Sequence, residues 1–420
     1  MQILFKGVKI IQAQSEWHLQ QVDLYVEDGN IKSIAKHIKP TANMQVIVAE
    51  DLHVSAGWFD VGTQVGDPGF EHRETIESAN AAATFGGYTA LAVMPNTIPV
   101  SHSKTEILYL KKQSEDCVVH FYPLGAISQN VKGQEISEMY DMNRAGAIGF
   151  TDGKYSLAHT GLMLRALEYV QPFDGLVLNH PNDALLSEQG QMHEGVMSTS
   201  LGMKGIPSIA EEMMLQRDIY LTEYSNGRYH AHNISTERSV QLVRDAKKRG
   251  LKVTASVAAL NLILTDDSLV DFDSNLKVNP PLRSASDIKA LKKGLRDGTI
   301  DFISSNHVPL DEESKNLEFP YASFGAIGLE TTFALTNTFS GLDLETIVEK
   351  LADSPRRIMR TPDATISVGA AANLTFFQPN LKWAFSSKDI NSKSKNTSWV
   401  GTSLVGKVFA IINKGKFERV

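Results

Sequence analysis

The stretch most informative about the fold is residues 60–69, which read Asp60-Val61-Gly62-Thr63-Gln64-Val65-Gly66-Asp67-Pro68-Gly69. An apolar run, Val54–Phe59, comes directly before this stretch, and a helical pattern from Glu71 to Phe85 follows it. A polar, glycine-rich segment between a buried strand and a helix is typical of the end of a barrel strand, where active-site residues gather. The stretch therefore predicts a strand–loop–helix unit with a site in its loop.

The same unit recurs along the chain. Further strands are predicted at Tyr88–Met94, Val118–Leu124, Ala147–Thr151, Gly175–Asn179, Arg228–Asn233, Leu251–Ala255 and Ile300–Ser305. Helical patterns separate several of them, at Ile209–Tyr224, Glu237–Arg249 and Asp287–Arg296. Eight strands that alternate with helices predict an α/β fold, a (β/α)8 barrel. An open doubly wound sheet is the competing fold, but the glycines after the first strand do not fit a dinucleotide-binding or P-loop spacing.

Both ends of the chain have a different, strand-only pattern. Short strands are predicted at Ile3–Phe5, Val8–Ile11, Val22–Val26 and Ile31–Ile34, with a turn at residues 28–30. After Arg360, strands are predicted at Ile366–Gly369, Asn373–Phe377 and Val408–Ile412, and the polar run 386–398 is predicted to be an exposed loop. We expect residues 1–55 and 363–420 to form one small composite β domain beside a barrel at 56–362.

Composition narrows the class of protein. A formal net charge of -7 argues against a nucleic-acid binder, which normally has a basic surface. The single cysteine excludes an intrachain disulfide and a cysteine-rich metal site. No apolar run approaches the roughly 18 residues of a membrane span, and the N-terminus continues into a strand pattern rather than a signal peptide. We therefore expect a cytoplasmic protein without a membrane partner.

Residues 60–69 resemble the metal-binding signature of dihydroorotases, members of the amidohydrolase superfamily, which reads Asp-x-His-x-His-x-Arg-(Asp/Glu)-Pro-Gly. Gly62 and Gln64 stand at the two histidine positions, and Gly66 stands at the arginine position. The frame of the motif is present without the residues that hold metal and substrate. The resemblance implies a barrel of the amidohydrolase type with an appended β domain.

Other motifs extend the resemblance to nearly the whole chain. Met94-Pro95-Asn96-Thr97 and Val278-Asn279-Pro280-Pro281 match family motifs, which implies substrate binding by Asn96 and Asn279 or a role in holding loop backbone. Phe150-Thr151-Asp152-Gly153 and Asn179-His180-Pro181-Asn182-Asp183 resemble segments that supply a metal-binding aspartate and histidine. Asp152 and His180 are thus the residual metal candidates. We favour a turn or capping role for Asp152 and a hydrogen-bonded barrel position for His180.

Two further motifs lack their ligands. In Tyr229-His230-Ala231-His232-Asn233-Ile234-Ser235-Thr236 the ligand position falls on Asn233. In Ser305-Asn306-His307-Val308-Pro309-Leu310 the position of the metal-binding general base falls on Asn306, and that of a substrate-binding histidine on Leu310. Neutral amides are poor ligands for a zinc-like ion, and an asparagine cannot accept a proton as a base. We therefore expect no intact catalytic residue and no metal cofactor.

The resemblance leaves several functions open. The preferred hypothesis is a non-catalytic dihydroorotase-like protein of pyrimidine biosynthesis, a scaffold or regulatory partner of aspartate carbamoyltransferase; the expected partner is either that enzyme or, in a homo-oligomer, another copy of this chain. An alternative is an active dihydroorotase or related cyclic amidohydrolase that uses zinc at an altered site. A relocated site could draw on four histidines: His180, His230, His232 and His307. A third alternative is a metal-free protein that binds a small molecule.

Overall fold

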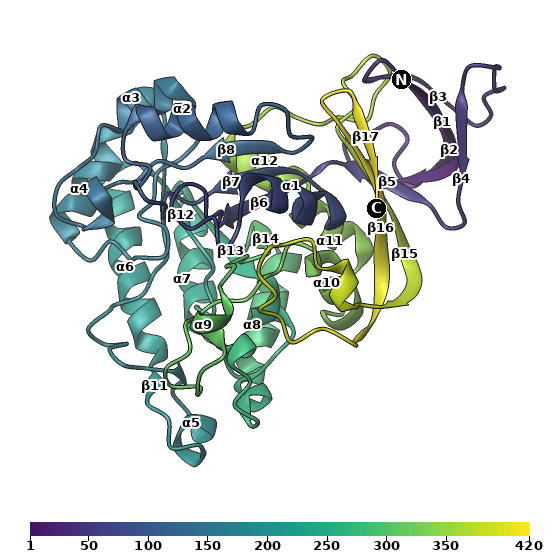
Figure 1. The fold of residues 1–420 in the computed structure, drawn as a ribbon. Helices are drawn as coiled ribbons and strands as arrows, with labels where there is room; N and C mark the ends of the chain where they lie inside the picture. The colour runs from purple at the N-terminus through teal and green to yellow at the C-terminus, as the bar shows by residue number, and fades with distance from the viewer.

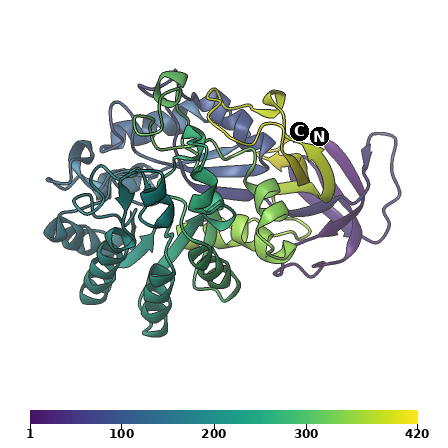
Figure 2. The same cartoon turned by 90° about the horizontal axis from the view of Figure 1, so that it is seen from below.

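The structure, a computed structural model, describes all 420 residues. A barrel of strands and helices makes up the larger part, and a sheet built from both ends of the chain lies beside it (Figure 1). Seen from below, the barrel helices form a row around the strands, and the sheet lies to one side of them (Figure 2). No helix is long and apolar enough to cross a membrane.

Parallel strands form the barrel. They are β6 (Trp58–Thr63), β7 (Tyr88–Val93), β8 (His120–Pro123), β9 (Leu176–Asn179), β12 (Arg228–Ala231), β13 (Val253–Ala258) and β14 (Phe302–Ser304). The predicted fourth strand is reduced to single bridges from Phe150 to Gly125 and Val177. Between β14 and β6, the Gln64 amide donates to the His307 carbonyl (3.0 Å), and the Asp60 carboxylate accepts from the Ser305 amide (2.6 Å). The predicted barrel class is confirmed.

Alternation along the strands separates two apolar layers. Phe59 and Val61 of β6 pack in one cluster with Phe302, which fills the barrel interior. Trp58 and Leu91 belong to the larger cluster between the strands and the surrounding helices. Because successive strand side chains point to opposite faces, each apolar strand serves both layers at once.

The barrel helices surround these strands. They are α1 (Ile76–Phe85), α2 (Lys104–Gln113), α3 (Met139–Ala145), α4 (Thr160–Tyr169), α6 (Ser208–Ser225), α7 (Glu237–Lys248), α8 (Ala285–Arg296), α10 (Thr332–Phe339), α11 (Leu344–Leu351) and α12 (Asp353–Met359). Short elements lie at the site end: β10 (Met192–His193), α5 (Val196–Ser200), β11 (Gly205–Ile206) and α9 (Glu312–Lys315). The helix predicted from Glu71 begins only at Ile76. A capping box explains the later start, since Thr75 accepts from the Ser78 amide (3.1 Å).

The composite β domain predicted from both termini is confirmed. Its strands are β1 (Gln2–Ile10), β2 (Gln21–Glu27), β3 (Asn30–Ala35), β4 (Gln45–Val48), β5 (His53–Ala56), β15 (Leu374–Ala384), β16 (Ser403–Asn413) and β17 (Lys416–Arg419). The sheet order is β17-β16-β15-β5-β1-β2-β3, with β4 beside β1. Phe5 and Phe376 stack across the sheet with ring centroids 4.0 Å apart. The exact domain boundaries stay a prediction.

Three local predictions are wrong. The strand predicted at Val54–Phe59 is two strands, because the chain leaves the β-domain sheet after β5 and enters the barrel at β6. Gly57 lies at this crossing, where a Cβ atom would come within 2.0 Å of Asn373 Oδ1. No strand forms at Ile366–Gly369. The run 386–398 is not an exposed loop, since Ser392, Ser394 and Asn396 in it are buried.

Candidate functional site

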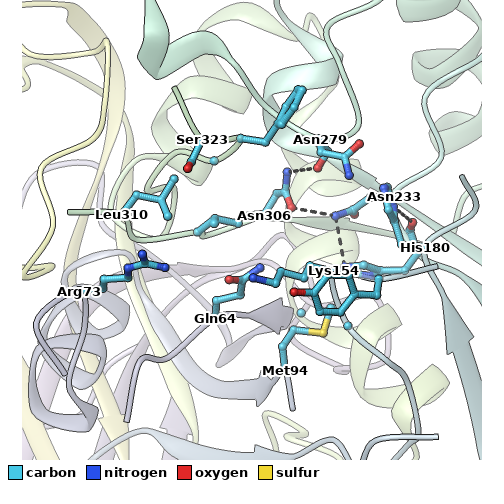
Figure 3. Close-up of a pocket in the computed structure, with 17 residues that line it drawn as sticks. Gln64, Arg73, Met94, Lys154, His180, Asn233, Asn279, Asn306, Leu310 and Ser323 are labelled. Atoms are coloured by element: carbon cyan, nitrogen blue, oxygen red, sulfur yellow. Dashed lines mark hydrogen bonds between the residues drawn. The ribbon is translucent and has the colours of Figure 1, made fainter. Parts of the chain in front are cut away.

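A pocket of about 390 Å³ opens at the carboxyl ends of the barrel strands. Side chains from nearly every strand end point into it (Figure 3). Its lining residues are Gly62, Gln64, Arg73, Met94, Gly153, Lys154, Tyr155, His180, His232, Asn233, Asn279, Asn306, Val308, Leu310, Ser323, Phe324 and Gly325. Two cations and several amides line this pocket, and no carboxylate does. A molecule that suits it is neutral or negatively charged.

Gly62 shows how the first replaced position has been filled. A Cβ atom added there would lie 2.4 Å from His232 Nε2, and the backbone has a φ of +99°. The imidazole of His232 therefore occupies the space that a side chain at residue 62 would need. A histidine at this position would require both a strained backbone and the displacement of a buried ring.

Gly66, at the arginine position of the motif, is equally closed to a side chain. An added Cβ atom would lie 2.2 Å from the Phe70 carbonyl oxygen and 2.6 Å from that of Glu74. These contacts are with backbone, so no rotamer change relieves them. The loop backbone therefore leaves no room for a side chain at residue 66.

The remaining replaced positions form a network of neutral amides. Asn233 donates from Nδ2 to Asn306 Oδ1 (3.3 Å) and accepts at Oδ1 from Ser304 Oγ (2.7 Å). Asn306 in turn donates to the Asn279 carbonyl oxygen (3.1 Å). Gln64 faces the same pocket (Figure 3). The amides hold one another where a metal centre would need imidazole or carboxylate donors.

The four histidines do not form a metal site. His180 and His232 line the pocket, but His230 is buried against Phe302, its ring 4.8 Å away, and bonds Thr254 and Ser256. His307 is fully buried, and its Nε2 lies 3.1 Å from a Glu74 oxygen. No group of three or more His, Cys, Asp or Glu side chains in the chain could hold a metal ion. The relocated four-histidine site is wrong, and the donors present do not fit a binuclear metal centre.

Asp152 and Asn96 support a loop rather than lining the pocket. The buried Asp152 carboxylate accepts from the Ser128 amide (2.9 Å), and burial raises its pKa. Asn96 donates to the Asp152 carbonyl oxygen and accepts from the Lys154 amide, both at 3.0 Å. These contacts give Asn96 the backbone-holding role, while Asn279 lies in the pocket wall.

His180 has an unused polar atom. Its Nδ1 lies 3.2 Å from the His232 carbonyl oxygen, and its buried Nε2 has no partner. Buried polar atoms are nearly always hydrogen-bonded, so this nitrogen is poised to bond a molecule in the pocket. Burial, together with the charge of His180, lowers the pKa of His232 to about 3. His232 is therefore a neutral ring at physiological pH.

The sequence patterns did not predict the roles of two neighbouring residues at the edge of the pocket, Arg73 and Glu74. Arg73 lines the pocket and makes an ion pair with Asp311 (2.7 Å). Glu74 is fully buried and accepts from the Lys393 amide (3.0 Å) and the Ser392 hydroxyl. It thereby anchors the run 386–398 beside the pocket. The sequence does carry one signal there, since Ser392-Lys393-Ser394-Lys395-Asn396-Thr397 resembles a C-terminal signature of dihydroorotases.

Comparison with known proteins identifies the family. A family model described as "Dihydro-orotase-like" matches residues 54–239. The dihydroorotase of Syntrophus aciditrophicus is 38% identical over 99% of both chains, and that of Pelotomaculum thermopropionicum is 40% identical over 99% of this chain and 98% of its own. This chain belongs to the dihydroorotase family.

Solved structures support the fold of this family member. An L-hydantoinase (dihydropyrimidinase) from Arthrobacter aurescens superposes with a TM-score of 0.87 at 23% identity, over 99% of this chain and 95% of its own. A D-hydantoinase superposes with a TM-score of 0.83 at 19% identity. The recognised family and the amidohydrolase-type barrel with its β domain are both confirmed.

Proposed function

We propose that this dihydroorotase-family protein does not hydrolyse dihydroorotate and serves pyrimidine biosynthesis as a scaffold or regulatory partner of aspartate carbamoyltransferase. The occupation of the residue 62 position by the His232 ring carries the proposal. A weaker donor at a metal-ligand position would still be compatible with a weak metal site. A ligand position whose space is occupied by another buried side chain is not compatible with a metal site.

The chemistry of the pocket supports the same conclusion. A metal-dependent amidohydrolase needs donors that hold an ion and a group that accepts the proton of the attacking water. Asn233 and Asn306 are neutral, bonded to each other, and unable to take up a proton. The site therefore supplies neither the metal donors nor the base that such hydrolysis needs.

Two measurements on the purified protein test the loss of hydrolysis. We expect less than one-tenth of an equivalent of zinc by elemental analysis after growth in zinc-supplemented medium, and no ring opening of dihydroorotate with added zinc. The Syntrophus aciditrophicus dihydroorotase, assayed in parallel, serves as the active control. One or two bound zinc ions with turnover that disappears in His180→Ala would overturn the proposal in favour of an altered hydrolase.

The scaffold role has a separate test. Mixed with the aspartate carbamoyltransferase of the same organism, the protein is expected to form a complex of defined stoichiometry in sedimentation velocity. The carbamoyltransferase should also become more heat-stable in that complex, since binding to the folded state raises the melting temperature. Two components that sediment independently at micromolar concentrations would contradict this role.

A second candidate function is metal-free binding of a small acid, and the unpartnered His180 Nε2 favours it. Arg73 and Lys154 supply positive charge in the same pocket. Dihydroorotate or carbamoyl aspartate is then expected to raise the melting temperature of the metal-free protein, and Lys154→Met to abolish the rise. Equal melting temperatures with and without these acids at millimolar concentration would count against binding.

A further inference from the structure

The polar groups that line the pocket without a partner in the chain fall into two sets. On one side are the buried His180 Nε2 and the side-chain amide of Asn279 (Figure 3). On the other side is Arg73, whose bonds to Asp311 and Ser314 leave one terminal guanidinium nitrogen without a partner (Figure 3). A molecule that satisfies both sets therefore has an anionic group at one end and a neutral hydrogen-bonding edge at the other.

The His180 ring determines what the neutral edge of the ligand must offer. Its Nδ1 lies 3.2 Å from the carbonyl oxygen of His232, and a carbonyl oxygen can only accept, so Nδ1 carries the proton. In the neutral ring Nε2 is then an acceptor and needs an N–H or O–H group from the ligand. The Asn279 amide, on the same side of the pocket, can donate to a carbonyl oxygen beside that group. These groups match an edge in which an N–H adjoins a carbonyl, as in a keto nucleobase.

Two buried lysines place positive charge behind one wall of the pocket. Lys277 Nζ lies 4.8 Å from the ring centroid of Phe324, and Lys315 Nζ donates to the Ser323 carbonyl oxygen (2.9 Å). Both ammonium groups bond only neutral oxygen atoms. Burial lowers the pKa of each lysine to about 8, so both are mostly charged at pH 7. Because charges interact more strongly where water is excluded, these two groups favour an anion in the adjoining pocket.

Tyr155 and the volume of the cavity limit the shape and size of the ligand. The Tyr155 ring lines the pocket and is 49% exposed, so a flat ring can stack on it. Lys154 Nζ lies 5.2 Å from the centroid of that ring and makes no ion pair. The cavity of about 390 Å³ has room for on the order of 13 water molecules at about 30 Å³ each. Bonded atoms pack more closely than separate waters, so a ligand of roughly 20 non-hydrogen atoms fits, and a single ring with a carboxylate fills only about half of the space.

We propose that the pocket binds a nucleoside monophosphate with a keto base, of which uridine monophosphate (UMP) matches the cavity in size. The base places its ring N–H at His180 Nε2 and a carbonyl oxygen at the Asn279 amide, and its ring stacks on Tyr155. The phosphate meets Arg73 and Lys154, since guanidinium and ammonium groups are the usual phosphate ligands in proteins. This binding extends the metal-free ligand binding proposed above and depends on it, because a metal ion would take His180 Nε2 as a ligand.

Isothermal titration calorimetry on the purified, EDTA-treated protein tests the choice of base and the need for phosphate. UMP is expected to bind with a dissociation constant below ~1 mM. Cytidine monophosphate (CMP) has an acceptor nitrogen where UMP has its N–H, so it should bind at least ~10-fold more weakly. Uridine, which lacks the phosphate, should also bind at least ~10-fold more weakly. Equal affinities for UMP and CMP, no measurable binding of UMP, or tighter binding of dihydroorotate than of UMP would each overturn the proposal.

Variants of the pocket test the assigned contacts. In His180→Gln the new amide can turn to offer a donor or an acceptor, so the dissociation constants of UMP and CMP should come within about threefold of each other. Lys154→Met should raise the dissociation constant of UMP at least ~10-fold, and the matched control Lys289→Met, exposed on α8, should change it by less than about threefold. A His180→Gln protein that melts as the unmodified protein does and still prefers UMP tenfold or more, about the worth of one base contact, would overturn the proposal.

Zinc analysis of the same samples separates this proposal from the proposed loss of hydrolysis. Protein without zinc that binds UMP as described supports both. Protein without zinc that fails to bind UMP refutes the nucleotide site alone. Bound zinc together with ring opening of dihydroorotate refutes the loss of hydrolysis, and with it the metal-free pocket that the nucleotide site requires.

Discussion

Replacing Glu74 with alanine is expected to destabilise the protein by about 3–5 kcal/mol, the usual range for removing one partner of a buried charged pair. The Glu74 carboxylate is fully buried and is shared among His307 Nε2 (3.1 Å), the Lys393 amide (3.0 Å) and the hydroxyls of Ser392 and Ser78. Each donor left without an acceptor costs roughly 1–3 kcal/mol. Some donors can find new partners, which keeps the total below the simple sum.

The assay is urea-induced unfolding followed by circular dichroism, with the free energy of unfolding extrapolated to water. Glu74→Gln keeps an acceptor oxygen without the charge and should lose only about 1–2 kcal/mol. Glu77→Ala, one turn away on the exposed side of α1, should stay within about 0.5 kcal/mol of the unmodified protein. A Glu74→Ala variant within 1 kcal/mol of the unmodified protein would refute the idea that this carboxylate anchors Ser392 and Lys393.

The contribution of Glu74 has a definite dependence on pH. Burial opposes its ionisation, but the hydrogen bond and charge of His307 and the bonds from Lys393 and Ser392 hold its pKa below the ordinary value. A carboxyl with a lowered pKa stabilises the fold above its unfolded pKa of about 4.3, and this stabilisation is lost as the pH falls through the lower, folded value. The difference between Glu74→Ala and the unmodified protein should therefore shrink as the pH falls below that range.

Three further results are expected. Gly66→Arg should not restore substrate binding and should lower the free energy of unfolding by at least about 1–3 kcal/mol, because its Cβ atom would lie 2.2 Å from the Phe70 carbonyl oxygen; unfolding in urea measures this. His232, with a pKa lowered to about 3, should stay neutral down to pH 5 in NMR titration, and the stability linked to it should fall as the pH drops from about 6.5 towards 3. Asn396→Ala should cost about 1–3 kcal/mol and weaken protection of residues 308–325 in hydrogen exchange, since it removes three side-chain bonds to that segment.

The alternation of strand and helix patterns and the order of the motifs were sufficient to predict the barrel. Apolar periodicity and glycine-rich loops are local properties of the chain, so they can be recognised without the fold. The resemblance to the family's motifs indicated which residues stand at the ligand positions, and residue type alone shows that Asn306 cannot act as a base. The appended sheet followed from the strand pattern at both ends. Element boundaries were less accurate, as at Thr75, where a capping side chain starts α1 later than the apolar pattern suggested.

Contacts between distant segments decided what the sequence alone could not. The polar run 386–398 looked like a solvated loop, yet Glu74, more than 300 positions earlier, buries part of it. The burial of a polar residue depends on a partner that only the folded chain provides. The sequence by itself thus determined the barrel and the family. Only the tertiary structure decided that His232 fills the space at Gly62, because that space is defined by a ring from a different strand.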